Sequence, residues 1–113
     1  MPAASRASAD TWFVYILRCG DESLYTGIAR DVQARVEAHA AGRGARYTRA
    51  RGPFEVCAVR RCRSKGEALS LELAIKRLGR KEKLALTLPK RLGAFARQSA
   101  AARRSRNADL HSG

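Results

Sequence analysis

The chain has 113 residues, and its 23 lysines and arginines outnumber the 10 acidic side chains to leave a net charge of +13. This length allows one domain with a modest core and excludes a large barrel or a multi-domain machine. The hydrophobic fraction of 45% is ordinary for a globular protein. The charge points to a polyanionic partner, with nucleic acid first and an anionic membrane surface or an acidic protein as the fallback.

Residues 1–10 are small and polar, so we expect a flexible N-terminus without a signal peptide. No stretch approaches the ~20 apolar residues of a membrane span, so we expect no membrane-spanning segment, and we expect nucleic acid as the partner in preference to a membrane. The three cysteines have no zinc-type spacing and are interpreted as reduced thiols, which favours a cytoplasmic protein.

The charge excess lies mainly in residues 11–92, which hold 18 basic and 8 acidic side chains. We expect this segment to be the folded domain. Residues 93–113 are rich in Ala, Ser and Arg and have almost no large apolar side chain. We expect a basic, mobile tail there, or a short frayed helix followed by disorder.

The first predicted elements form a β-hairpin. Segment 12–19 is aromatic and β-branched and ends at a Gly-Asp pair, and segment 23–28 reads as a second short strand. If residue 19 pairs with residue 23, Tyr15 faces Gly27 across the hairpin. Tyr15 and Tyr25 then lie diagonally on one face, where a tyrosine pair is more often core than catalytic.

A helix is predicted over 32–41, with Asp31 as its N-cap and a glycine just past its end. Arg35 and His39 share one face of this helix at i and i+4, a spacing that is usually no more than a polar surface. The loop that follows, 42–53, contains glycine, proline and four arginines around a Tyr-Thr pair.

A third strand is predicted over 54–62, followed by a helix that opens with a capping box of Ser64 and Glu67. On this helix Glu72 lies at the edge of the apolar face, where it can simply pair with Lys76 at i+4. A last short helix over 80–88 completes the order β-β-α-β-α-α. The expected fold is α+β, a small three-stranded antiparallel-type sheet flanked by helices.

The joint order of these residues resembles the GIY-YIG nuclease superfamily. The first motif corresponds to Phe13-Val14-Tyr15 or to Val14-Tyr15-Ile16, and in either case only its tyrosine is kept. The second motif corresponds to Tyr25-Thr26-Gly27. Arg35 and His39 on the next helix and the later segment around Glu72 follow in the order of that family. The resemblance covers about residues 11–90 and is nearest to the small bacterial single-domain branch, related to the catalytic domain of structure-specific endonucleases.

The resemblance implies hydrolysis of DNA phosphodiester bonds with one divalent cation, Mg²⁺ or Mn²⁺. It gives Glu72 the role of metal ligand, Arg35 that of neutralising the transition state, and His39 that of orienting or relaying a tyrosine proton. Tyr15, with Tyr25 beside it, would accept the proton of the attacking water. Gly27 would allow close backbone packing where the hairpin meets the helix.

The basic loop and the later helices supply the side chains expected to contact nucleic acid. These are Arg43, Arg46, Tyr47, Thr48, Arg49, Arg51, Lys76 and Arg80. Two other functions stay open from the sequence. The chain could be a non-catalytic nucleic-acid binding module on the same scaffold, or a nuclease subunit that is inactive until a protein scaffold docks.

Overall fold

A computed structural model of the chain describes residues 11–112. Two strands open the chain, β1 (Trp12–Arg18) and β2 (Leu24–Ala29), followed by α1 (Val32–Ala40) and a short 3₁₀ helix (Arg46–Thr48). The remaining elements are β3 (Glu55–Cys62), α2 (Lys65–Lys76), α3 (Arg80–Ala85) and α4 (Arg91–Ser112). The α+β class and the order β-β-α-β-α-α are confirmed, and α4 follows as a further helix. The flexible N-terminus expected over 1–10 lies outside the described residues.

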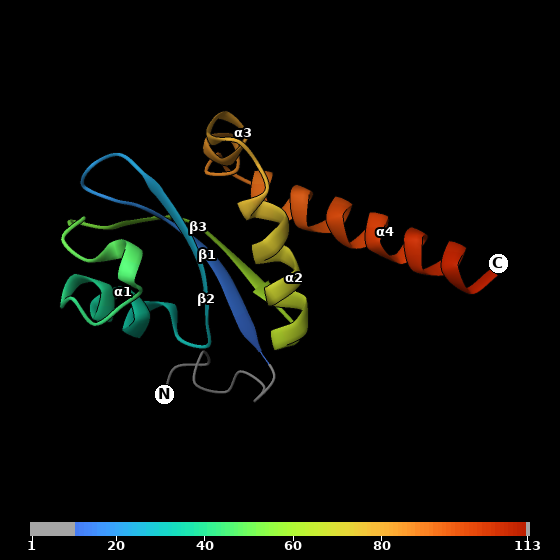
Figure 1. The fold of residues 1–113 in the computed structure, drawn as a ribbon, viewed down its shortest axis with the longest axis horizontal. Helices are drawn as coiled ribbons and strands as arrows, with labels where there is room; N and C mark the ends of the chain where they lie inside the picture. The colour runs from blue at the N-terminus through green and yellow to red at the C-terminus, as the bar shows by residue number, and fades with distance from the viewer. Residues whose placement is uncertain (1–10, 113) are drawn as a thin grey trace.

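The sheet has β1 at its centre, paired antiparallel with β2 on one side and β3 on the other (Figure 1). The hairpin register is the one expected, because Cys19 N–H donates to the Ser23 carbonyl at 2.9 Å and Tyr15 lies opposite Gly27. The pairing of β1 with β3 shifts between Ile16 and Leu17. Such a bulge accounts for the imperfect alternation of apolar and polar side chains along residues 54–62.

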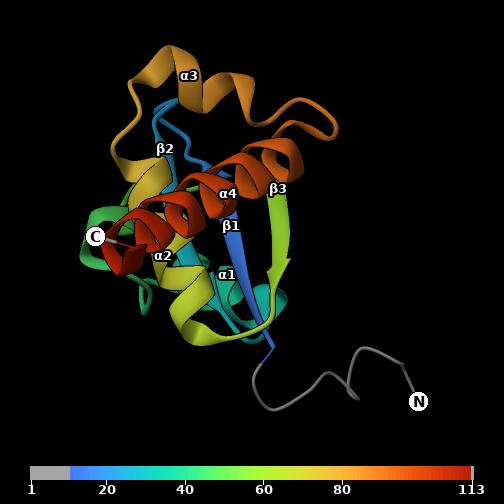
Figure 2. The ribbon, with the colours of Figure 1, turned by 90° about the vertical axis from the view of Figure 1, so that its right-hand side faces the viewer.

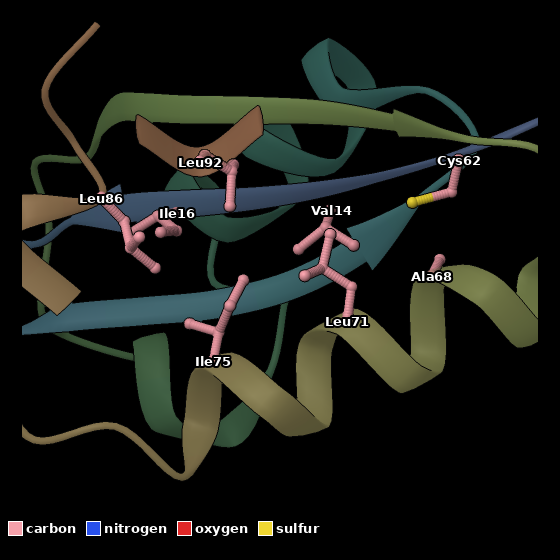
Figure 3. Packing of buried hydrophobic residues seen from close by; sticks show 8 residues of the cluster. All are labelled: Val14, Ile16, Cys62, Ala68, Leu71, Ile75, Leu86 and Leu92. Carbon is pink, nitrogen blue, oxygen red and sulfur yellow. The ribbon is translucent and has the colours of Figure 1, made fainter. Parts of the chain in front are cut away.

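The central strand is buried on both of its faces. Val14, Tyr15, Ile16 and Leu17 are each 0% exposed. Because successive side chains of a strand point to opposite faces, Val14 and Ile16 belong to one cluster and Tyr15 and Leu17 to another. In Figure 3, Val14 and Ile16 face Ile75 and the other apolar side chains of α2. The main core therefore lies on this face of the sheet, and Tyr15 faces away from it.

The helices are arranged in two layers around the sheet. Figure 1 shows α1 on one side of the sheet and α2 on the other. Figure 2, turned by 90°, shows α4 crossing the outside of the molecule over α2 and β3, and Figure 1 shows that its C-terminal end extends away from the sheet. The α4 helix contacts both β3 and α2. The middle of the molecule therefore has three layers, namely α1, the sheet and α2, and α4 extends beyond them.

Local capping explains where the first two helices begin. The Asp31 carboxylate accepts a hydrogen bond from the backbone N–H of Ala34, and Ser64 Oγ accepts one from Glu67 N–H. The reciprocal half of the expected capping box differs by one residue. The Glu67 carboxylate accepts from the backbone N–H of Arg63, and not from that of Ser64.

The region 93–113, for which we expect a mobile tail or a short frayed helix, lies for the most part in a helix of 22 residues, α4, which is longer than that expected helix. Leu92 is buried in the core and Phe95 and Ala96 pack against it, so the packed unit extends past residue 92. The scarcity of large apolar residues after Phe95 indicates that few side chains are buried there. It does not indicate whether the backbone forms a helix. Residues 94–112 contain neither Gly nor Pro and are rich in Ala and Arg, both good helix formers. Within residues 11–112, no helix combines the length and apolar character needed to cross a membrane.

Replacing Leu92 by alanine should test the attachment of α4. Leu92 is 4% exposed and packs in the core cluster, so Leu92→Ala should lower the free energy of unfolding by about 2–5 kcal/mol in urea denaturation. Leu88→Ala, at a position that is 53% exposed, is the matched control and should change it by about 0.5 kcal/mol or less. Equal effects of the two variants would show that α4 does not anchor in the core.

A candidate active site on the second face of the sheet

The candidate site begins with Tyr15, whose ring lies directly over Gly27 of the neighbouring strand. A Cβ at position 27 would lie 2.6 Å from Tyr15 Oη and 2.9 Å from Tyr25 Cε2. Any side chain larger than hydrogen would therefore collide with both tyrosines. The two rings lie 6.3 Å apart between centroids, as the diagonal pairing requires. Glycine at this position leaves room for both rings on this face of the hairpin.

His39 connects Tyr15 to the basic loop through a buried chain of hydrogen bonds. Tyr15 Oη is 2.9 Å from His39 Nε2, and His39 Nδ1 is 2.7 Å from Thr48 Oγ1. Thr48 donates its single hydroxyl proton to the Ala45 carbonyl at 2.8 Å, so its oxygen must accept from His39 Nδ1–H. This assigns Nε2 as the unprotonated nitrogen. The Tyr15 hydroxyl therefore donates its proton toward His39.

Two residues that hold His39 in place were not assigned this role from the sequence. Thr48 was expected among the nucleic-acid contacts, but its side chain is 1% exposed and bonds to His39 instead. Gly44 was not singled out. A Cβ there would lie 2.1 Å from His39 Nδ1 and 2.7 Å from Cγ, so the loop backbone packs directly on the imidazole. The Gly-rich composition of the loop was the only available signal for Gly44.

Tyr25 and Tyr47 join the hairpin to the loop. Their rings are stacked, with centroids 5.9 Å apart and planes 23° from parallel, and Tyr25 also lies 5.2 Å from the His39 ring. The Arg51 guanidinium lies 4.4 Å from the Tyr47 ring centre and forms an ion pair with Asp21 in the hairpin turn. These contacts place the exposed edge of Tyr47 beside the two tyrosines of the hairpin.

The electrostatic environment keeps both members of the Tyr15–His39 pair uncharged. Burial raises the pKa of Tyr15 from 10.0 to about 12, Tyr25 and Glu72 add to the increase, and Arg35 opposes it. Burial lowers the pKa of His39 below 6.5, and the positive charge of Arg35 lowers it further. At neutral pH Tyr15 is therefore a phenol and His39 a neutral imidazole.

Arg35 and Glu72 reach the same site from two different helices. Arg35 lies one turn before His39 on α1 and is exposed, and its charge acts on both Tyr15 and His39. Glu72 comes from α2, a helix that contacts β1 and β2, and its side chain is 18% exposed. Its carboxylate pairs with Lys76 at 3.3 Å, the simple i+4 pair that the sequence allowed. Tyr25 and His39 thus lie beside the Tyr15 ring, whereas Arg35 and Glu72 influence the pKa of Tyr15 through their charges.

The remaining expected nucleic-acid contacts are mostly exposed but do not form one patch. Arg43, Arg46 and Arg49 are exposed in the loop beside the site, and Tyr47 is 43% exposed. Arg51 is half-buried by its contacts with the hairpin. Two others, Lys76 and Arg80, are exposed at the end of α2 and the start of α3.

Glu72 is the residue of the site best suited to a metal ion. No three His, Cys, Asp or Glu side chains gather into a metal-binding group anywhere in the described part of the chain. A single partly exposed carboxylate fits a cation such as Mg²⁺, which keeps most of its water and takes few protein ligands. It does not fit a fully protein-coordinated zinc centre.

Comparisons with known proteins place these residues in a family. The sequence profile of the GIY-YIG catalytic domain matches residues 11–85. A UPF0213 protein of Oceanobacillus iheyensis is 53% identical over 74 residues, covering 66% of this chain and 86% of its own. A UPF0213 protein of Staphylococcus aureus is 49% identical over 77 residues, covering 68% of this chain and 94% of its own. The solution NMR structure of a UPF0213 protein from Bacillus halodurans is 42% identical, covers 74% of this chain and 93% of that one, and superposes with a TM-score of 0.46.

Gly44→Ala should test whether the loop backbone holds His39. The added methyl group would overlap the buried imidazole, so we expect urea denaturation to show a loss of about 1–3 kcal/mol in the free energy of unfolding. Gly66→Ala is the matched control, because a Cβ there meets only Ser64 Oγ at 3.9 Å. It should leave stability unchanged or increase it by up to about 1 kcal/mol, since alanine favours a helix. A Gly44 variant as stable as the Gly66 variant would contradict the packing described here.

Proposed function

Since this chain belongs to the GIY-YIG family, a family of nucleases, we propose that it hydrolyses DNA phosphodiester bonds with the help of a divalent cation. The observation that supports this most directly is the buried hydrogen bond from Tyr15 to the unprotonated Nε2 of His39. A buried phenol needs a hydrogen-bond partner in any case, but the partner here is a neutral imidazole, a group that can also accept the proton of the phenol. The proposed substrates are nicked, flapped or branched DNA.

In the proposed reaction, Tyr15 and His39 act together to remove the proton of the attacking water. Tyr15 alone is a weak candidate for a base at pH 7, because its phenol is protonated with a pKa of about 12. Through the hydrogen bond, the Tyr15 oxygen takes a proton from water while its own proton moves to His39 Nε2. The water oxygen then bonds to phosphorus, the bond from phosphorus to the leaving sugar oxygen breaks, and that oxygen takes a proton from solvent. His39 carries the proton of the water as an imidazolium until it returns it to solvent. Thr48 accepts from Nδ1–H throughout and keeps the ring oriented.

Arg35 and the cation would stabilise the negative charge that develops on the phosphate in this reaction. Arg35 is exposed beside the phenol, and its guanidinium can donate two parallel hydrogen bonds to phosphate oxygens. The cation, when bound, would stabilise negative charge on the phosphate and on the leaving oxygen. Glu72 would hold it, which requires the carboxylate to exchange Lys76 for the ion.

The exposed loop arginines would contact the DNA backbone beside the site. Arg43, Arg46 and Arg49 lie on the segment that also supplies Thr48, so phosphate binding and placement of His39 depend on one loop. Tyr47 offers a partly exposed aromatic edge next to them. Such a combination suits a nucleic acid, because arginines bind phosphates and an aromatic ring stacks on bases.

A non-catalytic binding module remains the second candidate, and the ion pair of Glu72 with Lys76 favours it. In that case the carboxylate would only stabilise its own helix, and binding would need no divalent cation. Both candidates bind DNA, so affinity alone does not distinguish them. Metal-dependent turnover does.

A cleavage screen over structured DNA with Mg²⁺ or Mn²⁺ should distinguish the two candidates. We expect cleavage by the wild type and a loss of about 10²–10³-fold or more for Arg35→Ala and Glu72→Ala, because each removes charge stabilisation at the reacting phosphate. Glu37→Ala, an exposed change on α1, is the control and should leave the rate unchanged. No cleavage of any substrate by the wild type, or full activity of Glu72→Ala, would support the binding module instead.

The pH dependence of cleavage should show which group receives the proton. If His39 receives the proton through Tyr15, the single-turnover rate should increase with pH up to about pH 6.5 and stay constant at higher pH. The reason is that His39 must be neutral to accept the proton, and its pKa lies below the ordinary 6.5. A Tyr15 phenolate acting alone would give a rate that increases about tenfold per pH unit up to pH 9, since its pKa is about 12. The rate is to be measured from pH 5.5 to 9. A rate that keeps increasing over this whole range would contradict proton transfer to His39 through Tyr15.

A further inference from the structure

A second concentration of positive charge lies on the other face of the sheet, away from Tyr15. A hollow of about 330 Å³ opens where the end of β3, the start of α2 and the middle of α4 meet. Arg60 is opposite Val14 on the face that carries the main core, so this hollow and the candidate active site are separated by the sheet. Five arginines line it, namely Arg60, Arg63, Arg97, Arg103 and Arg104.

The acidic groups near these arginines do not neutralise them. Glu67 is the single carboxylate in the lining, and it accepts a hydrogen bond from the backbone N–H of Arg63 as part of the α2 cap. Among residues 11–105, whose side chains the structure describes, the ion pairs involve Arg18, Arg51 and Lys76, and none of the five arginines. Gathering like charges in one hollow costs free energy, which an anionic ligand would recover.

Two of the guanidinium groups lie close to the same residue, Gly93 of α4, which is next to the hollow and not part of its lining. Arg60 Nη1 and Arg97 Nη1 lie 3.3 and 3.5 Å from the position that a Cβ on Gly93 would occupy. One arginine comes from β3 and the other from α4, so their approach depends on the packing of the helix against the strand. Guanidinium groups arranged in this way can donate to two oxygens of one phosphate.

The spacing of the arginines favours an extended ligand over a single ion. Arg97 and Arg104 are seven residues apart on α4, which is roughly 10 Å along a helix axis. Side chains that extend outward from these two positions can each bind a different phosphate of a nucleic-acid strand, in which phosphates recur about every 3.4 Å along the axis. We propose that this arginine pocket binds the phosphodiester backbone of a second nucleic-acid segment, on the opposite side of the sheet from the candidate active site. The binding does not depend on cleavage.

Salt-dependent binding of labelled duplex DNA to the full chain tests the pocket, with divalent cations chelated so that no cleavage occurs. The double variant Arg60→Gln with Arg97→Gln should reduce the slope of log K against log salt by about 0.9 for each phosphate that the protein no longer neutralises. The charge-matched control, Lys81→Gln with Arg91→Gln, removes two exposed charges outside the pocket and should reduce the slope less. Equal slopes for the two double variants would overturn the proposal.

A second pair and a second polyanion complete the experiment. If the half-buried Arg60 cannot be replaced without unfolding, as judged by thermal melting, Arg103→Gln with Arg104→Gln should give the same reduction in slope.

Competition by polyglutamate distinguishes phosphate recognition from general charge attraction. It should compete with DNA only weakly in the wild type. Competition as strong as that of unlabelled duplex would assign the pocket to an acidic protein and overturn the nucleic-acid assignment. The cleavage screen can fail without affecting any of these outcomes.

Discussion

The burial of β1 on both faces is the constraint on which the rest of the structure depends. The strand is central in the sheet, and four successive side chains from Val14 to Leu17 are withdrawn from solvent. Alternation along a strand sends half of them into the core under α2 and half toward α1. A shift of one residue in register would move Tyr15 into the apolar core and expose Ile16 to the polar site. The register that buries the apolar side chains of β1 therefore also determines the position of the Tyr15 phenol.

A polar group carried into a buried position must find partners, and the loop between α1 and β3 supplies them. Tyr15, His39 and Thr48 form a chain that ends on the Ala45 carbonyl, and in the described part of the chain no buried side-chain nitrogen or oxygen lacks a partner. Each link satisfies the one before it. Loss of one link leaves a buried polar atom unpaired, at a cost of about 1–3 kcal/mol. This explains why a loop with little regular structure is held so closely against the sheet.

Positive charge in this protein is arranged on two faces with different architectures. Beside Tyr15 the arginines lie on a loop that also supplies Thr48, the hydrogen-bond partner of His39. On the opposite face the arginines of the hollow come from β3, the turn that follows it, and α4. The sheet separates the two groups of arginines, because Val14 and Arg60 lie on one face of it and Tyr15 on the other.

The sequence by itself determined the features that depend on neighbouring residues. The hairpin register follows from the turn length, and the starts of α1 and α2 follow from Asp31 and Ser64, because those hydrogen bonds join residues at most four apart. The order of Tyr15, Tyr25, Arg35, His39 and Glu72 was also sufficient to indicate the family. Local propensity was underestimated in α4, where the absence of glycine and proline from residues 94–112 allowed a long helix despite little burial.

Only the tertiary structure decided how distant segments meet. Nothing in the loop sequence distinguishes Thr48, which supports the imidazole, from its exposed neighbours. Gly44 acquires its importance from a ring five residues away that folds back onto it. The convergence of Arg60 and Arg97 likewise requires α4 to lie against β3. Periodicity and capping act within a few residues and can be recognised in a sequence, whereas these contacts depend on the packing of whole elements, which no short pattern encodes.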